Sequence, residues 1–277
     1  MDCFKKEKTI LAFLLCTLFS GIIYSQSPLH LFVEVTEEDS TLYASRYGLF
    51  TVDNDGISGR VYKEETKWYE LLDSTMTALP RETSNVLFYI HGMWGHREMF
   101  LKKAHDALGK DVYQDPGLEY GIIVTLIWHS GLNYYENVKH ARAVGAYFSD
   151  EVRRIVNNSG KNSFLCHSMG NRVFQGLYHA SANVPIPNIE HILMLAPDLE
   201  ADIFNKGNPL SEMHKLCKQI TIYGHKQDFT LNMSKALNKN ERLGMYIENE
   251  TCKEGGCITH IDAVSYTHLT LPTTPYV

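Results

Sequence analysis

The stretch that decides the fold is FLCHSMGN, residues 164–171, in which an apolar strand leads into a sharp turn and then a helix. This order is typical of a nucleophile elbow, where a serine stands in a strained turn above a sheet. The strand and the helix can approach each other only if the positions two before and two after the serine are small. Gly170 meets this requirement, and Cys166 replaces the usual glycine. Ser168 is therefore the candidate nucleophile.

A second motif, HGMWG at residues 91–95, follows the apolar run Val86–Ile90. It resembles the HGxxG loop that supplies oxyanion-hole amides in lipases and esterases. We expect the backbone N–H groups of Met93 and Met169 to be the donors. His91 is interpreted as a structural histidine that orients the loop. His167 is not expected to be the base, because an elbow directs neighbouring side chains apart.

Short β-rich runs alternate with helical segments from about residue 86 onward, which indicates a parallel sheet covered by helices. The expected strands are 86–90, 122–128, 163–166, 189–196, 219–223 and 257–263. Apolar residues at helical spacing predict a helix over 138–155. Earlier in the chain, residues 29–35 and 43–52 look extended, and 63–79 look helical up to Pro80. The prediction is an α/β fold with a mostly parallel central sheet and helices on both faces.

From about residue 85 to 245 the chain resembles the bacterial alpha/beta-hydrolase family of unknown function. The motifs that carry the resemblance appear in order: FYIHG, Trp128-His129-Ser130, the HSMGN elbow, Ala196-Pro197-Asp198, and the segment Tyr223 to Asp228. His129 stands where the family has proline, and Gly224 with His225 replace the usual residues. The resemblance implies the alpha/beta-hydrolase fold and a serine-dependent acyl hydrolysis.

The family's chain order is nucleophile, acid, then histidine after the last strand. Asp228 is the expected acid, since a carboxylate there would hold the imidazole tautomer and stabilise its charged form. Asp198 is the rival, although its preferred role is to cap a helix over 199–204. His260 is the candidate base because it is the native histidine in the right region, yet it lies inside the expected last strand. The true base is expected in a segment that the chain lacks.

Residues 264–277 differ in character from the rest of the chain. VSYTHLTLPT resembles, codon for codon, the translation of a transposon mosaic end joined to a sequencing-library adapter, and Val277 with the stop fits the same adapter. Such segments are excluded from fold reasoning. We therefore expect a hydrolase domain over 26–263, truncated at its C-terminus, and no catalytic role for His268.

The first residues predict a signal peptide over 1–25. Three lysines, Lys5, Lys6 and Lys8, precede an apolar run from Ile10 to Ile23, and Ser25 offers a small residue for cleavage. The run is shorter than the ~20 residues that span a bilayer. The expected location is secreted, periplasmic or in the cell envelope, with membrane association only through this segment.

Composition excludes several classes of function. The 26 Lys and Arg against 32 Asp and Glu give a net charge of -6, without the basic cluster that nucleic-acid binding requires. Cys252 and Cys257 flank a short loop and form either a small disulfide ring or two free thiols. No metal or other cofactor is expected, because neither a CxxC spacing nor a histidine partner is present.

The leading interpretation is an esterase, lipase or related acyl hydrolase that acts on a small-molecule or lipid-like ester without a cofactor. The alternative is a catalytically inactive binding protein of the cell envelope, since a fold alone does not establish a function. A third interpretation, a membrane-attached envelope factor, depends on retention of the N-terminal apolar run.

Overall fold

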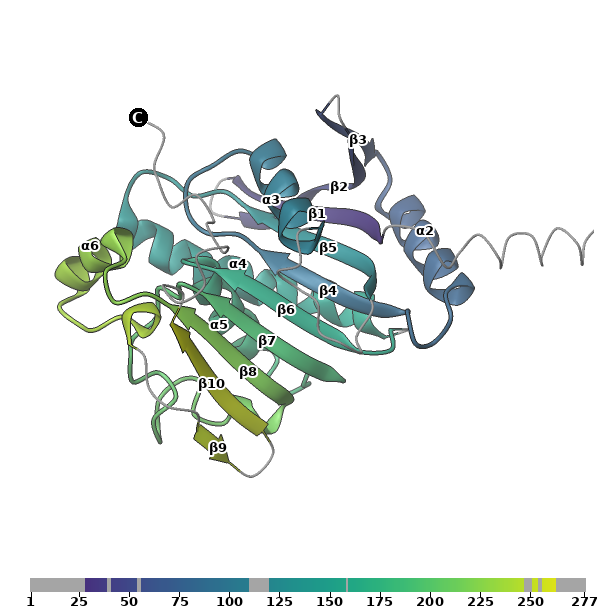
Figure 1. Ribbon diagram of the computed structural model, residues 1–277. Helices are drawn as coiled ribbons and strands as arrows, with labels where there is room; N and C mark the ends of the chain where they lie inside the picture. Colours follow the sequence, from purple (N-terminus) through teal and green to yellow (C-terminus); the bar gives the residue numbers. More distant parts are fainter. Residues whose placement is uncertain are drawn as a thin grey trace, which may run out of the picture.

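The computed structural model describes residues 28–38, 41–53, 56–109, 120–157, 159–246, 251–253 and 256–262. Its strands form one sheet, in the order β3-β2-β1-β5-β4-β6-β7-β8-β10-β9 (Figure 1). The strands are β1 (Leu29–Glu38), β2 (Thr41–Asp53), β3 (Gly56–Tyr62), β4 (Asn85–Ile90), β5 (Tyr120–Trp128), β6 (Asn162–His167), β7 (Ile189–Leu195), β8 (Cys217–Gly224), β9 (Thr251–Lys253) and β10 (Gly256–Asp262). The expected signal peptide over 1–25, the adapter-like segment 264–277 and His268 lie outside the described residues.

The centre of the sheet is parallel, as the sequence predicts. Every neighbouring pair from β1 through β5, β4, β6, β7 and β8 to β10 is parallel. Strands β2 and β3 add to one edge in antiparallel fashion, and β9 adds to the other. Parallel neighbours bring the carboxyl ends of β4, β6, β7 and β8 to one edge, where ligands bind in open α/β sheets.

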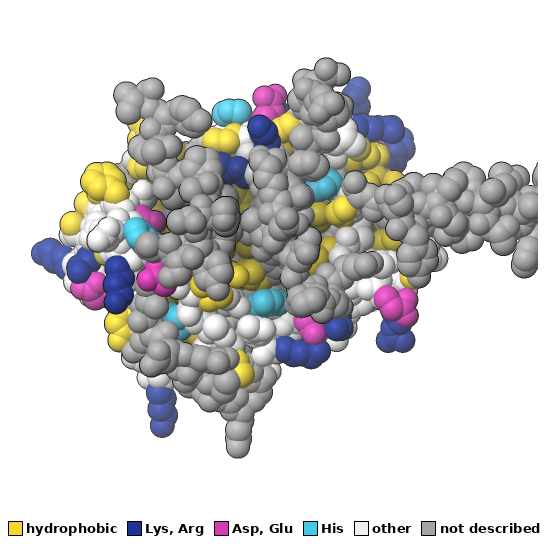
Figure 2. All heavy atoms as spheres, viewed as in Figure 1, with side chains coloured by type: hydrophobic (Ala, Val, Ile, Leu, Met, Phe, Trp, Pro, Cys, Tyr) yellow, Lys and Arg dark blue, Asp and Glu magenta, His cyan; other side chains and the backbone are white. Residues whose placement is uncertain are grey.

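Helices cover both faces of the sheet, which confirms the predicted fold class (Figure 1). The helices are α2 (Glu65–Ala78), α3 (Arg97–Gly109), α4 (Tyr134–Val156), α5 (Gly170–Ala180) and α6 (Phe229–Asn238), with short 3₁₀ turns at Met213–Lys215 and Leu243–Met245. Helices α2, α4 and α5 pack on one face, and α3 packs on the other. Helix α6 stands beyond the strand ends, and hydrophobic side chains lie on the surface around it (Figure 2).

Alternation along the strands builds the two cores. In β4, Val86, Phe88 and Ile90 join the core beneath α4 and α5, whereas Leu87 and Tyr89 join the core beneath α3. Both faces of a central parallel strand are buried, so such strands read as continuous apolar runs. No helix in the described ranges has the length and apolarity needed to cross a membrane.

The two ends and the buried face of α4 explain why this segment is helical. Asn133 precedes the helix, and its side chain accepts hydrogen bonds from two backbone N–H groups of the first turn. Arg153 and Arg154 occupy the last turn, where positive charge complements the helix dipole. The apolar face packs on the sheet through Val144, Phe148 and neighbouring residues.

The C-terminal strand pair settles one of the open cysteine alternatives. Cys257 in β10 is disulfide-bonded, and Cys252 in β9 is its direct cross-strand neighbour. A free thiol at Cys257 is therefore excluded. Cys166 and Cys217 are free and buried.

Candidate active site

Ser168 lies in a strand–turn–helix unit with the backbone expected of a nucleophile elbow. Strand β6 ends at His167, helix α5 begins at Gly170, and Ser168 between them has φ +50°. Non-glycine residues seldom adopt positive φ, because the Cβ then crowds the backbone. A Cβ on Gly170 would lie 2.5 Å from the carbonyl oxygens of Ile90 and of His91, so only glycine lets α5 start this close to β4.

Hydrogen bonds hold this turn from three sides. The N–H of Ser168 donates to the carbonyl of Leu195 at 2.8 Å, at the end of β7. The carbonyl of Ser168 accepts from the backbone N–H and the side-chain amide of Asn171, at 3.1 and 2.9 Å, and from the N–H of Asp198 at 3.3 Å. The same Asn171 amide reaches the carbonyl of Cys166 at 3.2 Å. These bonds offset the conformational cost of the positive φ.

The HGMWG loop packs directly against Ser168. A Cβ on Gly92 would lie 3.0 Å from the Ser168 Cβ, so the loop backbone borders the turn. The N–H groups of Met93 and Met169 donate no hydrogen bond to any described residue, whereas the N–H of Trp94 donates to Ser130 Oγ at 2.9 Å. Both amides therefore remain available as hydrogen-bond donors, as oxyanion stabilisation would require.

His91 is fixed inside the protein beneath this loop. The N–H of Trp128 donates to its Nε2 at 3.1 Å, so Nδ1 carries the proton of the neutral ring and donates to the Gly92 carbonyl at 2.6 Å. Its ring stacks on Phe100 with centroids 3.3 Å apart. Burial lowers the pKa of His91 to about 3. These contacts support the structural role that the sequence indicates.

Asp198 does not cap a helix, and the expected helix over 199–204 was wrong. Those residues form turns and an isolated bridge of Glu200 to Arg242, and the Asp198 side chain points inward and is only 3% exposed. Its Oδ2 accepts from the Tyr134 hydroxyl at 2.7 Å, and its Oδ1 accepts from Ser234 at 2.5 Å. Buried guanidinium groups of Arg172 and Arg242 approach the same two oxygens at 3.8 and 3.7 Å. Both oxygens of Asp198 are therefore occupied.

Asp228 performs the capping that the sequence reading gave to Asp198. It lies in the loop after β8, and its Oδ1 accepts from the N–H of Leu231 at 2.9 Å, in the first turn of α6. Its second oxygen has no hydrogen-bond partner among the described residues. Since Asp262 pairs with Gly224 at the end of β10, this strand ends beside the loop that carries Asp228.

His260 is not brought to Ser168. It lies within β10 in register with Ile222, which is in register through Met194 with Cys166 in β6. Three strand spacings of about 4.8 Å separate β10 from β6. The backbone of His260 therefore lies about 14 Å from that of Cys166, two residues before Ser168. Its Nδ1 lies 3.3 Å from the carbonyl of Tyr246. Within the described residues, no histidine ring forms a hydrogen bond with the Ser168 hydroxyl.

His167 directly precedes Ser168 at the end of β6. It is the last residue of β6, and burial, with a smaller contribution from Lys103, lowers its pKa to about 4. The ring is therefore neutral at physiological pH. Its Nδ1 lies beside Gly92, 3.0 Å from the position a Cβ would take there.

A charged cluster that the sequence did not reveal lies near the HGMWG loop and joins β1 to the start of α3 and to the residue after β5. Glu34 in β1 is 2% exposed and accepts from Arg97, the first residue of α3, and its Oε1 lies 3.0 Å from Nε2 of His129, which follows β5. Burial acts to raise the pKa of Glu34, but the bonds from His129 and Arg97 outweigh it and lower the pKa overall. The sequence signal that could have revealed this cluster is the Trp128-His129-Ser130 segment. His129 contacts Glu34, and Ser130 accepts a hydrogen bond from the N–H of Trp94 in the HGMWG loop.

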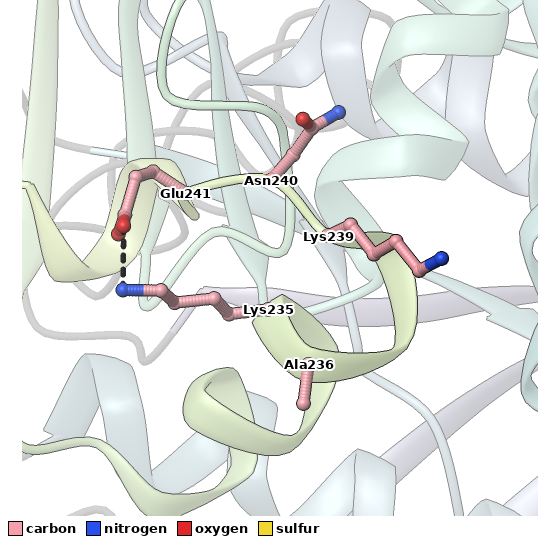
Figure 3. Close-up of a pocket in the computed structure, with 5 residues that line it drawn as sticks. All are labelled: Lys235, Ala236, Lys239, Asn240 and Glu241. Atoms are coloured by element: carbon pink, nitrogen blue, oxygen red, sulfur yellow. Dashed lines mark ion pairs between the residues drawn. The ribbon is translucent and has the colours of Figure 1, made fainter.

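A surface pocket lies at the end of α6, away from these groups. It is lined by Lys235, Ala236, Lys239, Asn240 and Glu241, and an ion pair of 2.5 Å joins Lys235 to Glu241 across it (Figure 3). None of the candidate catalytic residues lines it, so we do not assign it to the substrate. Among the described residues, no group of three or more His, Cys, Asp or Glu could hold a metal ion.

Comparison with known proteins identifies a protein family whose sequence model matches this chain. The sequence model of a family described as alpha/beta hydrolase of unknown function (DUF900) matches residues 77–269. No curated protein sequence matches the chain significantly. One solved structure with some similarity is that of a lipase-esterase related protein from Clostridium acetobutylicum ATCC 824, at 12% identity over 65% of this chain and 86% of that chain, with a TM-score of 0.32. That similarity is too low to indicate a function.

Proposed function

Because the chain belongs to the alpha/beta-hydrolase family of unknown function, we propose that it is a serine hydrolase that cleaves carboxylic esters, with Ser168 as nucleophile. The observation that carries the proposal is the backbone of Ser168. A non-glycine residue at φ +50° follows a central strand, and Gly170 allows the close approach that this turn needs. Strain of this kind is retained where it serves a function.

In the proposed reaction, Ser168 Oγ attacks the ester carbonyl while the amides of Met93 and Met169 stabilise the oxyanion. A histidine accepts the hydroxyl proton and passes it to the leaving alcohol, and water then releases the acyl group. Asp228 holds that histidine in the correct tautomer through its unoccupied carboxylate oxygen. We assign the histidine to the segment after β10, since β10 ends beside the Asp228 loop.

We further propose that the substrate is a small-molecule or lipid-like ester and that the protein acts outside the cytoplasm. The predicted signal peptide supports this location. The disulfide at Cys257 supports it independently, because disulfides persist in oxidising compartments.

Labelling with a fluorophosphonate probe tests the proposal. The chain is compared with a version in which residues 264–277 are replaced by the C-terminal segment of a complete family member. We expect the completed chain to label and to hydrolyse p-nitrophenyl esters, and Ser168→Ala to abolish both, by analogy with triads in which loss of the nucleophile costs on the order of a millionfold in rate. Turnover by Ser168→Ala within tenfold of its parent would remove the serine assignment.

A second candidate, an inactive binding protein that keeps the fold, is favoured by one observation: no described histidine reaches Ser168. The same experiment separates the two. If the completed chain failed to label although its melting temperature equalled that of the chain with residues 264–277, the enzyme proposal would be replaced by that of an inactive binding protein.

A further inference from the structure

Two large apolar side chains are exposed on the loops that follow β4 and β5. Trp94 in the HGMWG loop is 50% exposed, and Leu132 in the loop between β5 and α4 is 93% exposed. Both loops leave the carboxyl ends of central parallel strands, the edge at which open α/β sheets bind ligands. Neither side chain is there to fill a core, so their exposed surface calls for another role.

Hydrogen bonds join these two loops to each other and to the proposed oxyanion hole. The backbone N–H of Trp94 donates to Ser130 Oγ at 2.9 Å, two residues before Leu132. The buried side-chain amide of Asn137 donates to Met93 Sδ at 3.0 Å and to the backbone carbonyl just before Leu132 at 2.8 Å. Trp94 and Leu132 therefore belong to one bonded unit with Met93, whose amide is a proposed oxyanion donor.

The backbone of Trp94 is strained. Its φ is +59°, which bulky side chains seldom adopt because the Cβ then crowds the backbone. Burial of the indole does not compensate for this cost, since half of the side chain is exposed. Strained residues of this kind cluster at functional sites. The position of Trp94, two residues after the glycine that borders Ser168, indicates a part in binding the substrate.

The order of the strands gives the direction in which each half of an ester would lie. The loops after β4 and β5 stand on one side of β6, which carries Ser168, and the Asp228 loop and β10 stand on the other (Figure 1). In the proposed reaction the histidine held by Asp228 protonates the leaving alcohol, so the alcohol must face the β8 side. The acyl chain leaves the carbonyl carbon by a different bond, and the side that remains is that of Trp94 and Leu132.

We propose that Trp94 and Leu132 bind the acyl chain of the ester, so that the enzyme prefers esters of longer aliphatic acids to acetate esters. We call these two residues the acyl rim. This inference rests on the proposed hydrolysis through Ser168. Removing one methylene from water contributes about a fourfold preference. Contact of only part of an eight-carbon chain with the acyl rim should therefore give a preference for octanoate over acetate of at least about tenfold.

Hydrolysis of p-nitrophenyl acetate and octanoate by the completed chain tests the acyl rim, because the alcohol is the same in both. Trp94→Asn removes the indole and keeps a residue that tolerates positive φ, and Leu132→Ala shortens the second side chain. Each should lower the octanoate-to-acetate ratio of kcat/KM by about fourfold or more. Phe229→Ala is the matched control, since Phe229 is 74% exposed directly after Asp228, on the alcohol side, and should leave the ratio unchanged.

Ethyl and octyl acetate reverse the comparison, because only their alcohol differs. An unchanged octanoate-to-acetate ratio in both Trp94→Asn and Leu132→Ala would overturn the acyl rim. A loss of preference for octyl over ethyl acetate in these two variants, with the acyl preference retained, would also overturn it, because the rim would then bind the alcohol.

Binding without turnover separates this inference from the proposed hydrolysis. Trp94 is the exposed one of the three tryptophans, since Trp68 and Trp128 are buried, so emission lost in Trp94→Asn reports on the acyl rim alone. Methyl 8-bromooctanoate is added to the chain as given with Ser168→Ala. We expect saturable quenching of the Trp94 emission, and a several-fold higher ester concentration for half-maximal quenching after Leu132→Ala.

The two sets of measurements assign any failure to one proposal. Saturable quenching of Trp94 with no hydrolysis by the completed chain would leave the rim as a site for an aliphatic chain and remove the esterase. Hydrolysis with no quenching and with an unchanged ester ratio would keep the esterase and remove the acyl rim.

Discussion

The backbone N–H of Asp198 donates to the carbonyl oxygen of Ser168 at 3.3 Å, which couples the loop after β7 to the turn that carries the candidate nucleophile. The same residue gathers Tyr134, Ser234 and the buried Arg172 around its carboxylate. Asp198 thus lies next to Ser168 as a buried structural ion, while the exposed loop after β8 supplies the proposed acid, Asp228.

The two aspartates should respond in opposite ways to replacement by asparagine. Asp198→Asn removes one of the two carboxylates that face the buried Arg172 and Arg242, the other being Glu200, so we expect the free energy of unfolding to fall by about 2 kcal/mol. Asp228→Asn should leave stability nearly unchanged, because asparagine caps helices as well as aspartate does. It should lower ester turnover of the completed chain by on the order of 10⁴. Chemical denaturation measures the free energy of unfolding, and p-nitrophenyl ester assays measure turnover. If Asp198→Asn lowered turnover more than Asp228→Asn did, Asp198 would be the acid.

The roles of these two aspartates could not be predicted from the sequence, although much of the fold could. The elbow and strands β4 to β8 could be predicted, because apolar runs, glycine spacing and turn residues are local properties. Which aspartate is buried depends on Tyr134 and Ser234, which lie 64 and 36 residues from Asp198 in the chain. Strand β3, GISGRVY, was missed because its two glycines and its arginine hide any apolar alternation.

Glu34 should make stability depend on pH. Its pKa lies below the ordinary 4.5, so its bonds to Arg97 and His129 contribute fully above that value and are lost as the pH falls through the lower pKa of the folded state. At pH 7 we expect Glu34→Gln to destabilise the protein by about 2 kcal/mol. Thermal melting should show this difference constant down to about pH 5 and shrinking below pH 4.5.

Glu64→Gln is the matched control for this measurement, since Glu64 forms an exposed ion pair with Lys67. Exposed pairs of this kind contribute little. A difference between wild type and Glu34→Gln that persists unchanged in acid would show that Glu34 acts through packing and not through its charge.

His260→Ala should change ester turnover of the completed chain by less than about twofold, because three strand spacings of about 4.8 Å separate β10 from β6. In the chain as given, His268→Ala should also have no effect on the rate of fluorophosphonate labelling. The family match extends to residue 269 and so includes His268. Loss of labelling in His268→Ala alone would therefore identify His268 as the base and disprove the adapter interpretation of residues 264–277.

Two glycines that border Ser168 should separate stability from reactivity. Gly170→Ala places a methyl group 2.5 Å from two fixed backbone oxygens of β4 and the residue after it, so we expect a loss of about 2 kcal/mol in the free energy of unfolding. Gly92→Ala places its methyl group 3.0 Å from the Ser168 Cβ, beside the attacking oxygen. Small misplacements at a reacting centre cost on the order of a hundredfold in rate.

Gly131→Ala serves as the control, because its nearest neighbour would be the side-chain oxygen of Asn137 at 3.8 Å, an ordinary contact. Melting temperatures and labelling rates of the three variants are compared in the completed chain. Gly131→Ala should match its parent in both, and Gly170→Ala should melt earlier. Gly92→Ala should label about a hundredfold more slowly, with a smaller loss of stability than Gly170→Ala, because its contacts with His167 and Ser168 are 3.0 Å and not 2.5 Å. If Gly92→Ala labels as fast as its parent, the backbone at Gly92 does not border the path of the reacting oxygen of Ser168, and the HGMWG loop loses its proposed place at the reacting centre.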